Sequence, residues 1–319
     1  MIFTALVTSF LASFWAVPVL IPRLRRAGIV GQDMHKADQP EIPEMGGLAL
    51  VAGFGAGILL AIAMETFWPN LLSVDLTVLL AVLCTVLLTT MIGVLDDLMG
   101  IRQWVKALLP LVAALPLVAV RAGVSTMRIP FIGQVDFGPF YALVLVPIGV
   151  TGAANAVNML AGFNGLEAGM GLVAMGSLAV IAASLGATTS LVLLLAGIGG
   201  LLGVLYFNWY PAKVFVGDVG TLSIGAIIAA AVIVGNFETA GIIMFIPYAI
   251  DLLFKATHRF PKSFGELRDG KLHCPADGPK GLCQAIMKLA GGIHERTLVL
   301  VLMGIEAVFG VLAIVLYGM

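Results

Sequence analysis

Long apolar runs separated by short polar segments constrain this chain more than any other feature of its sequence. A helix that crosses a bilayer needs about 20 mainly apolar residues. By that test the sequence contains about ten candidates, at residues 2–22, 47–64, 76–95, 104–120, 139–157, 167–185, 188–206, 219–235, 238–254 and 296–317. A water-facing surface all round is excluded, since 60% of the residues are apolar and 11% are charged. The sequence therefore predicts an all-α polytopic membrane protein.

Basic residues give this arrangement an orientation. All but two of the 17 Lys and Arg residues, Arg121 and Arg128, fall in or beside alternate connections between the predicted spans. Cytoplasmic loops carry an excess of Lys and Arg, so we expect these connections inside and both chain ends outside. The first run lacks a preceding basic region and a clear cleavage site, which favours a retained span over a removed signal.

The connections differ in their expected content. Residues 127–139 show short apolar alternation and predict a small hairpin on the outer side. Residues 255–295 form the one inner segment long enough to fold as a cytoplasmic appendage. We otherwise expect a single transmembrane catalytic domain over residues 1–319, with its active site on the inner face and membrane lipid around it.

A polar island at residues 155–169 interrupts two apolar runs. Asn155 and Asn158 share one face of a helix, and Gly162 is the first of three glycines that break the helix beyond them. Carboxamides and free backbone N–H groups at a helix end suit a phosphorylated ligand or a metal–phosphate pair. The alternative is a polar loop with a helix cap.

Three carboxylates and one lysine sit at other inner boundaries. Asp96 and Asp97 end the third run, Lys106 enters the fourth, and Asp218 opens the eighth between glycines. Paired acids can gather Mg²⁺ or take a proton, and a lysine opposite them can hold a phosphate. Each acid could instead be a helix-terminal residue without chemistry.

Together these motifs resemble the polyprenyl-phosphate N-acetylhexosamine-1-phosphate transferases. The similarity rests on the paired acids with the following lysine, the N-x-x-N island running into A-G-F-N-G-L-E-A-G, and F-V-G-D at residues 215–218. The first inner loop, with G-Q-D-M-H-K and I-P-E-M-G, is similar to the branch of eukaryotic and archaeal dolichyl-phosphate GlcNAc-1-phosphotransferases. The resemblance covers roughly residues 20–260.

The resemblance implies a reaction and its metal site. These enzymes move a sugar-1-phosphate from a UDP-sugar onto a polyprenyl or dolichyl phosphate and release UMP. Asn158 and Asp218 would bind Mg²⁺, with Mn²⁺ as the other ion, against the donor diphosphate. Lys106 and the helix end around Asn155 would hold the acceptor phosphate.

The resemblance also implies donor contacts. Gly162, Asn164 and Phe215 would enclose the uracil of a UDP-N-acetylhexosamine. Two inner loops would supply the remaining donor contacts, from Gln32, Asp33, Met34, Glu44, His258 and Arg259. In the eukaryotic enzymes an arginine precedes the matching histidine, whereas Thr257 stands here.

The acceptor phosphate is already largely ionised at neutral pH, because its second pKa is about 6. We therefore expect Asp96 and Asp97 to serve in positioning and metal support, with general-base duty as a hypothesis for one of them. The setting would be a plasma membrane, by preference archaeal, and the product the first lipid-linked sugar of protein N-glycosylation.

Other readings remain open at this point. A secondary transporter would suit ten Gly-rich spans, although transporters place ionisable sites near mid-membrane. A non-catalytic scaffold would leave the four motifs without a purpose, and a CDP-alcohol phosphotransferase would need an acid motif that is absent. His273, Cys274, Cys283 and His294 could form a zinc set, but without paired C-x2-4-C spacing. We expect no nucleic-acid partner and allow for a homodimer.

Overall fold

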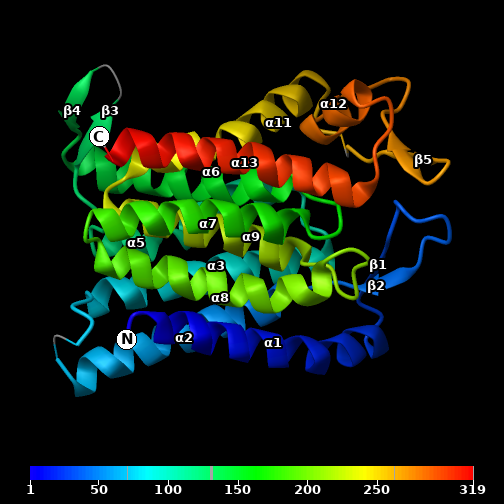
Figure 1. Ribbon diagram of the computed structural model, residues 1–319. Coiled ribbons are helices and arrows are strands. Elements are labelled where there is room, and N and C mark those ends of the chain that lie inside the picture. Colours follow the sequence, from blue (N-terminus) through cyan, green and yellow to red (C-terminus); the bar gives the residue numbers. More distant parts are fainter. Residues whose placement is uncertain (70, 130–131, 262, 319) are drawn as a thin grey trace.

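Eight helices in the described part of the chain are long and apolar enough to cross a membrane. The computed structural model describes residues 1–69, 71–129, 132–261 and 263–318. The eight are α1 (Phe3–Arg26), α2 (Gly47–Phe67), α3 (Leu76–Met99), α6 (Val146–Met159, continuous with the π-helix η1, Tyr141–Leu145), α7 (Leu166–Ser184), α8 (Thr188–Asn208), α9 (Gly217–Gly235) and α13 (Glu295–Gly318). They run roughly alongside one another in an elongated bundle (Figure 1).

Two further predicted spans are broken helices. The segment predicted at residues 238–254 is α10 (Glu238–Met244) followed by α11 (Ile246–Thr257), bent by 53°. The segment predicted at 104–120 is α4 (Gln103–Ala113) followed by α5 (Leu115–Ala119). Together these two helices are shorter than the helices that can cross a membrane.

Proline explains both breaks and the difference from the predicted count of ten. Pro116 and Pro247 are the second residues of α5 and α11. Proline cannot donate the helical hydrogen bond and its ring clashes with the preceding turn, so each helix restarts there. The described residues contain eight spans, or nine if α10 and α11 are one, and the count of ten is not confirmed.

Helix α9 is the centre of the bundle. All its residues from Val219 to Ile233 are buried, which fits a helix that is apolar on every side. Small residues let its neighbours approach closely. A Cβ on Gly93 of α3 would lie 2.5 Å from the Cα of Val219, and one on Gly225 would lie 2.3 Å from the carbonyl oxygen of Ala153 on α6. The ends of α3 and α6 are thereby held against the start of α9.

In the described residues, three two-stranded antiparallel sheets lie at the two ends of the bundle. They are β1 (Val30–Gln32) with β2 (Glu41–Pro43), β3 (Thr126–Ile129) with β4 (Gly133–Asp136), and β5 (Glu266–Arg268) with β6 (Lys271–His273). The hairpin predicted at 127–139 is confirmed as β3–β4, although residues 130–131 at its turn lie outside the described residues. Both chain ends lie at the β3–β4 end, and β1, β2 and β5 lie at the other (Figure 1).

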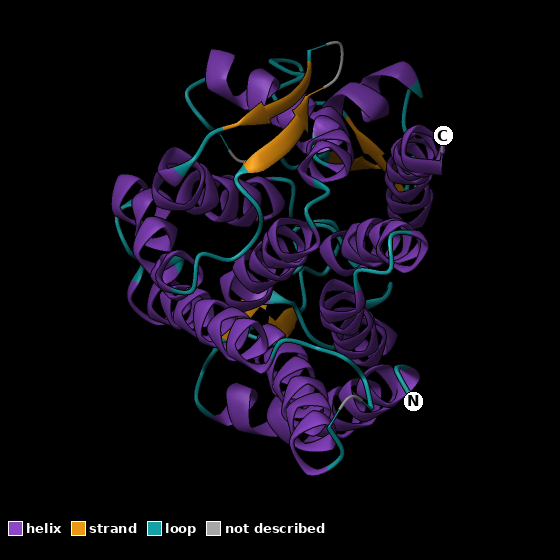
Figure 2. Cartoon of the chain, turned by 90° about the vertical axis from the view of Figure 1, so that its left-hand side faces the viewer, coloured by secondary structure: helices purple, strands orange, loops and turns teal. Residues whose placement is uncertain are grey.

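The appendage predicted at 255–295 contains β5, β6 and the short helix α12 (Leu282–Leu289). It packs on α11 and α13, and an isolated bridge pairs Leu272 with Ile293. Figure 2 views the bundle from its β3–β4 end, so that most helices are seen nearly end-on and the appendage lies behind. The loops that carry the predicted site residues are therefore gathered at one end of the molecule.

Candidate active site

Three helix ends bring the central acids together. Asn158 lies in the last turn of α6 and Asp218 in the first turn of α9. The side-chain nitrogen of Asn158 donates to Oδ1 of Asp218 at 2.6 Å and to the hydroxyl oxygen of Thr221 at 2.8 Å. The two residues predicted to share a metal ion are thus in direct contact.

Lys106 of α4 completes this group. Its Nζ lies 2.7 Å from Oδ2 of Asp96 and also pairs with Oδ2 of Asp218. The other oxygen of Asp96 accepts the backbone N–H of Ile101 at 2.7 Å, which fixes the turn from α3 into α4. Lys106 is 6% exposed. We call Asp96, Lys106, Asn158 and Asp218 the acid–lysine cluster.

Asp97 joins the acid–lysine cluster through the backbone of α9. Its two oxygens accept the N–H groups of Asp218 at 3.0 Å and of Val219 at 3.2 Å. An acid at this place satisfies otherwise unpaired donors and interacts favourably with the positive end of the helix dipole. Gly217 allows this approach, because its φ is +70° and a Cβ there would lie 2.7 Å from Oδ2 of Asp97. Asp97 therefore fixes the start of the helix that presents Asp218.

Asn155 lies one turn before Asn158 and faces α4. Its amide nitrogen donates to the carbonyl oxygens of Ala107 at 3.0 Å and Thr151 at 2.8 Å. The side chain therefore ties α6 to the helix that carries Lys106. Its predicted contact with an acceptor phosphate stays a prediction.

The loop between α1 and α2, which we call the first inner loop after its expected side, is attached to the start of α9 through backbone hydrogen bonds. The N–H of Phe215 donates to the carbonyl of Pro43, and the N–H of Gly46 donates to the carbonyl of Phe215, both at 2.8 Å. Glu44, between these points, is close enough to Asp97 for the two carboxylates to repel. The structure thus brings Glu44 and Phe215 to the edge of the acid–lysine cluster. Gln32 and Met34, on the same loop, are exposed.

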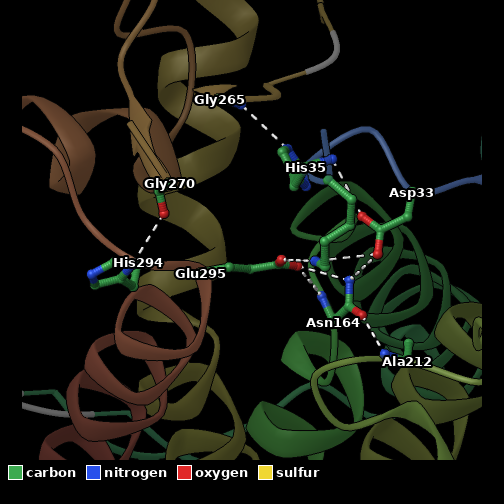
Figure 3. Close-up of polar contacts among 9 residues, drawn as sticks. Asp33, His35, Asn164, Ala212, Gly265, Gly270, His294 and Glu295 are labelled. Atoms are coloured by element: carbon green, nitrogen blue, oxygen red, sulfur yellow. Dashed lines mark hydrogen bonds and ion pairs between the residues drawn. The ribbon is translucent and has the colours of Figure 1, made fainter. Parts of the chain in front are cut away.

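Asn164 and Asp33 meet in a second buried network, shown in Figure 3. The amide nitrogen of Asn164 donates to Oδ2 of Asp33 at 3.1 Å and to Oε1 of Glu295 at 2.8 Å. Its oxygen accepts the N–H of Ala212 at 2.6 Å. Lys36 pairs with both carboxylates, at 3.3 Å from Oδ2 of Asp33. We call Asp33, Lys36, Asn164 and Glu295 the loop clamp.

His35 lies beside the loop clamp. Its ring stacks on Phe163 with centroids 4.4 Å apart and meets Phe264 edge-on at 5.5 Å. Burial lowers the pKa of His35, although the charges of Glu295 and Asp33 oppose that shift. The ring is therefore neutral at pH 7, which agrees with its Nε2 facing the backbone N–H of Gly265 at 3.4 Å.

Lys36 keeps its charge, because at this residue the neighbouring carboxylates outweigh the effect of burial. Burial alone lowers its pKa, but the hydrogen bond to Glu295 and the charges of Glu295 and Asp33 outweigh burial and raise the pKa above the ordinary value. A cation is thus permanently present between the two carboxylates of the loop clamp.

The glycine loop before α7 is held by Glu167. The N–H of Gly162 donates to Oε1 of this buried carboxyl at 2.6 Å. A Cβ on Gly162 would lie 3.1 Å from the ring of Phe264, so the appendage rests directly on the loop. Gly162 and Asn164 therefore lie in one short, tightly packed segment.

His258 and Arg259 lie elsewhere, at the exposed end of α11. The ring of His258 contacts the carbonyl of Phe254 at 2.9 Å and lines a cavity of about 530 Å³ that also touches Asp277. None of the contacts described for these two residues reaches the acid–lysine cluster. Their predicted donor contact stays a prediction.

Glu295 and Lys255 belong to this region but stand in no motif of the sequence. The position of Glu295 at the start of the last apolar run is its only signal. Lys255 is one basic residue among many in the sequence, yet it is buried, pairs with Asp251 at 2.9 Å and donates to the carbonyl oxygen of Met159 beside Asn158. Among the described residues, the structure groups none of the three cysteines with two other metal-ligating side chains, so the zinc set gains no support.

The sequence of the chain is similar to those of known proteins. The chain is 38% identical, over 97% of its own length and 94% of the relative's, to a Saccharolobus solfataricus protein provisionally named UDP-N-acetylglucosamine–dolichyl-phosphate N-acetylglucosaminephosphotransferase. It is 26% identical to the Dictyostelium discoideum protein of that name, over 90% and 81% of the two chains. It is 35% identical to a phospho-N-acetylmuramoyl-pentapeptide-transferase of Halalkalibacterium halodurans, over 78% and 79%.

The family match coincides with the part of the chain that builds the acid–lysine cluster. The sequence model described as glycosyl transferase family 4 matches residues 79–236, which contain all four members of that cluster and Asp97. With a relative 38% identical along almost the whole length, the chain belongs to glycosyl transferase family 4.

Proposed function

We propose that this protein transfers N-acetylglucosamine-1-phosphate from UDP-N-acetylglucosamine to a polyprenyl or dolichyl phosphate and releases UMP. The observation that carries the proposal is the contact between Asn158 and Asp218, with Lys106 beside them, at one end of a membrane-spanning bundle. The printed names of the relatives support the same substrates. They give no support to a transporter.

The residues present fit a divalent cation. Asp96 and Asp218 share the single ammonium group of Lys106, and the carboxylate of Asp97 lies on the backbone N–H of Asp218, so negative charge is in excess there. Carboxylate and carboxamide oxygens are ligands that Mg²⁺ prefers. Rotation of the Asn158 side-chain amide by about 180° would place its oxygen, which can bind a metal, where its nitrogen lies now. We assign the metal to Asn158 and Asp218, where bound Mg²⁺ or Mn²⁺ would neutralise charge on the donor diphosphate.

Lys106 would hold the acceptor phosphate. Its ammonium group is buried between two carboxylates, so positive charge is stabilised at this point and is presented from α4. An oxygen of the lipid phosphate attacks the β-phosphorus of the donor. The new P–O bond forms as the bond from the β-phosphorus to the bridging oxygen breaks, and UMP leaves with that oxygen. Both reactants are anionic, so catalysis requires neutralisation and alignment above all.

Asp96 and Asp97 would act by positioning. Asp96 holds Lys106, and Asp97 fixes the start of α9 through its backbone N–H groups. An acceptor phosphate with a second pKa of about 6 needs no base at neutral pH. A general-base step is therefore not part of the proposal.

The reaction would take place at the cytoplasmic face of the plasma membrane. The Lys and Arg bias favours the end that carries β1, β2 and β5 as cytoplasmic, and both chain ends lie at the other end (Figure 1). One substrate has a long apolar tail and the other is water-soluble, so a site at the bilayer boundary meets both. The product would begin a lipid-linked oligosaccharide for protein glycosylation.

A donor screen tests the proposal. Protein purified in detergent is given polyprenyl phosphate and, in turn, UDP-GlcNAc, UDP-GalNAc and UDP-MurNAc-pentapeptide, with Mg²⁺ or with EDTA. We expect UMP and a sugar-diphosphate lipid in equal amounts from UDP-GlcNAc with Mg²⁺. Faster turnover of UDP-MurNAc-pentapeptide would contradict the donor assignment, and no product from any donor would contradict the proposed function.

A further inference from the structure

Glu295 is the first residue of α13 and is only 6% exposed. Its Oε1 accepts two hydrogen bonds from Asn164, one from the backbone N–H and one from the side-chain amide, both at 2.8 Å. Its Oε2 pairs with Lys36. One carboxylate from the end of the chain therefore fixes both the backbone and the side chain of Asn164.

A metal ion is the other reading of these acids. The ligand atoms of Asp33, His35 and Glu295 lie within 4.8 Å of one another. Nζ of Lys36 pairs with both carboxylates, and Nε2 of His35 faces the N–H of Gly265. The remaining carboxylate oxygens accept hydrogen bonds from Asn164 and from the N–H of His35, so every ligand atom of this group already has a partner within the protein.

The loop clamp joins segments that are far apart in the sequence. Lys36 and Asp33 belong to the first inner loop, and the ammonium of Lys36 also lies 4.2 Å from the ring centroid of Tyr210. Asn164 precedes α7 and accepts the N–H of Ala212. Four segments meet at the clamp, and Figure 3 shows Asp33, Asn164, Ala212 and Glu295 converging.

The segment after Ala212 leads directly to the acid–lysine cluster. Phe215 is bonded by its backbone to the first inner loop, and Asp218 follows three residues later. The clamp therefore constrains the first inner loop and the segment that carries Phe215, to both of which we assign contacts with the donor nucleotide. Lys106 and Asn155, to which we assign the acceptor, are held by α4 and α6 instead.

We propose that Glu295 is a positioning residue for the nucleotide-sugar donor. Through Asn164 and Lys36 it holds the two donor loops in their binding arrangement, and it makes no contact with the reacting atoms. This inference rests on the proposed function. It gives the appendage and the start of α13 a part in donor recognition and none in acceptor recognition.

The test compares Glu295→Ala, Glu295→Gln and a control. Glu295→Gln keeps the shape and an acceptor oxygen for Asn164 but loses the charge opposite Lys36. Glu295→Ala removes both. The matched control is Glu266→Gln, on the exposed strand β5 of the same appendage. Rates of UMP release are measured with donor and acceptor varied separately, and UMP binding is measured directly by calorimetry.

If Glu295 positions the donor loops, donor affinity should fall more in Glu295→Ala than in Glu295→Gln, and acceptor affinity should not change. We expect the KM for UDP-GlcNAc and the Kd for UMP to rise about tenfold in Glu295→Ala, since a buried donor left unpaired costs about that factor. Glu295→Gln should recover much of the loss. The KM for polyprenyl phosphate should stay constant, the kcat should change by less than about threefold, and the control should match the wild type.

Other outcomes separate the two proposals. Equal changes in both KM values, or unchanged UMP affinity in Glu295→Ala, would overturn the positioning role. If Glu295→Ala does not fold, Glu295→Gln alone must still raise the Kd for UMP relative to Glu266→Gln. If the wild type binds UMP but makes no product, the proposed function fails while UMP affinity still decides the role of Glu295.

Discussion

The side-chain nitrogen of Asn158 lies 2.6 Å from Oδ1 of Asp218, although 60 positions separate the two residues in the sequence. The contact exists because α6 and α9 pack closely and the last turn of α6 lies beside the first turn of α9. It places a carboxamide and a carboxylate where one ion could bind both.

Replacing Asp218 by Asn should abolish most activity. The substitution keeps the size of the side chain but removes a charge next to Lys106 and a metal ligand. We expect UMP release to fall by about a hundredfold or more, the usual loss when one strong electrostatic contact to a transition state is removed. Asp269→Asn is the control, because Asp269 is exposed at the β5–β6 turn. Activity near the wild-type level in Asp218→Asn would remove this residue from the site.

Removing divalent cations should stop the reaction reversibly. With EDTA we expect no UMP release, and with added Mg²⁺ full recovery. Binding can also be measured without turnover. Mg²⁺ should raise the thermal denaturation temperature of the wild type by mass action, and should not raise that of Asp218→Asn. An equal rise in both proteins would show that the ion binds elsewhere.

Comparing Gly217→Ala with Gly270→Ala should distinguish the effect of backbone strain on stability from the effect of displacing Asp97 on activity. Gly217 has φ +70° and a Cβ there would meet Asp97, whereas Gly270 has φ +74° and open space around it. Both alanine variants should lose roughly 1 kcal/mol of stability from the left-handed conformation. Only Gly217→Ala should also lose activity, because Asp97 must move from the start of α9. Equal activity in the two variants would argue against a positioning role for Asp97.

His35 should make stability depend on pH. Because burial lowers the folded-state pKa below 6.5, the unfolded chain binds more protons in the range just below that value. The stabilisation is complete above pH 6.5 and is lost as the pH falls toward the folded-state pKa. His35→Phe keeps a ring against Phe163 but cannot titrate. We expect its denaturation temperature to fall less than that of the wild type between pH 7 and pH 5.

If the wild type and His35→Phe lose stability in parallel between pH 7 and pH 5, His35 is not the titrating group. The measurement is best made without substrates, because donor binding would stabilise the same loops. The lysine of the loop clamp should not contribute, since its pKa is raised and it stays charged throughout this range.

The sequence alone predicted the helical membrane fold and the closeness of the central residues. Apolar run length identified the helices of the bundle but not α12 of the appendage, and the motifs pointed to Asp96, Lys106, Asn158 and Asp218, which the structure brings into contact. The span count was less accurate. Apolar composition does not report where a helix is interrupted, and Pro116 and Pro247 break two of the runs.

The loop clamp could not be predicted. The contact between Lys36 and Glu295 joins residues 259 positions apart, and it depends on how the start of α13 is placed over the first inner loop. Neither residue stands in a periodic pattern that indicates a partner. Likewise, the contact of Lys255 with the end of α6 follows from the bend between α10 and α11, which sets the direction of α11.

Both chain ends lie at the β3–β4 end of the bundle (Figure 1). A helix of about 20 residues is roughly 30 Å long, so each end is about that far from the acid–lysine cluster. An affinity tag or a fluorescent reporter can therefore be fused to either end without blocking the loops. The same placement makes protease protection of a terminal tag in sealed vesicles a direct assay of which way the protein is inserted.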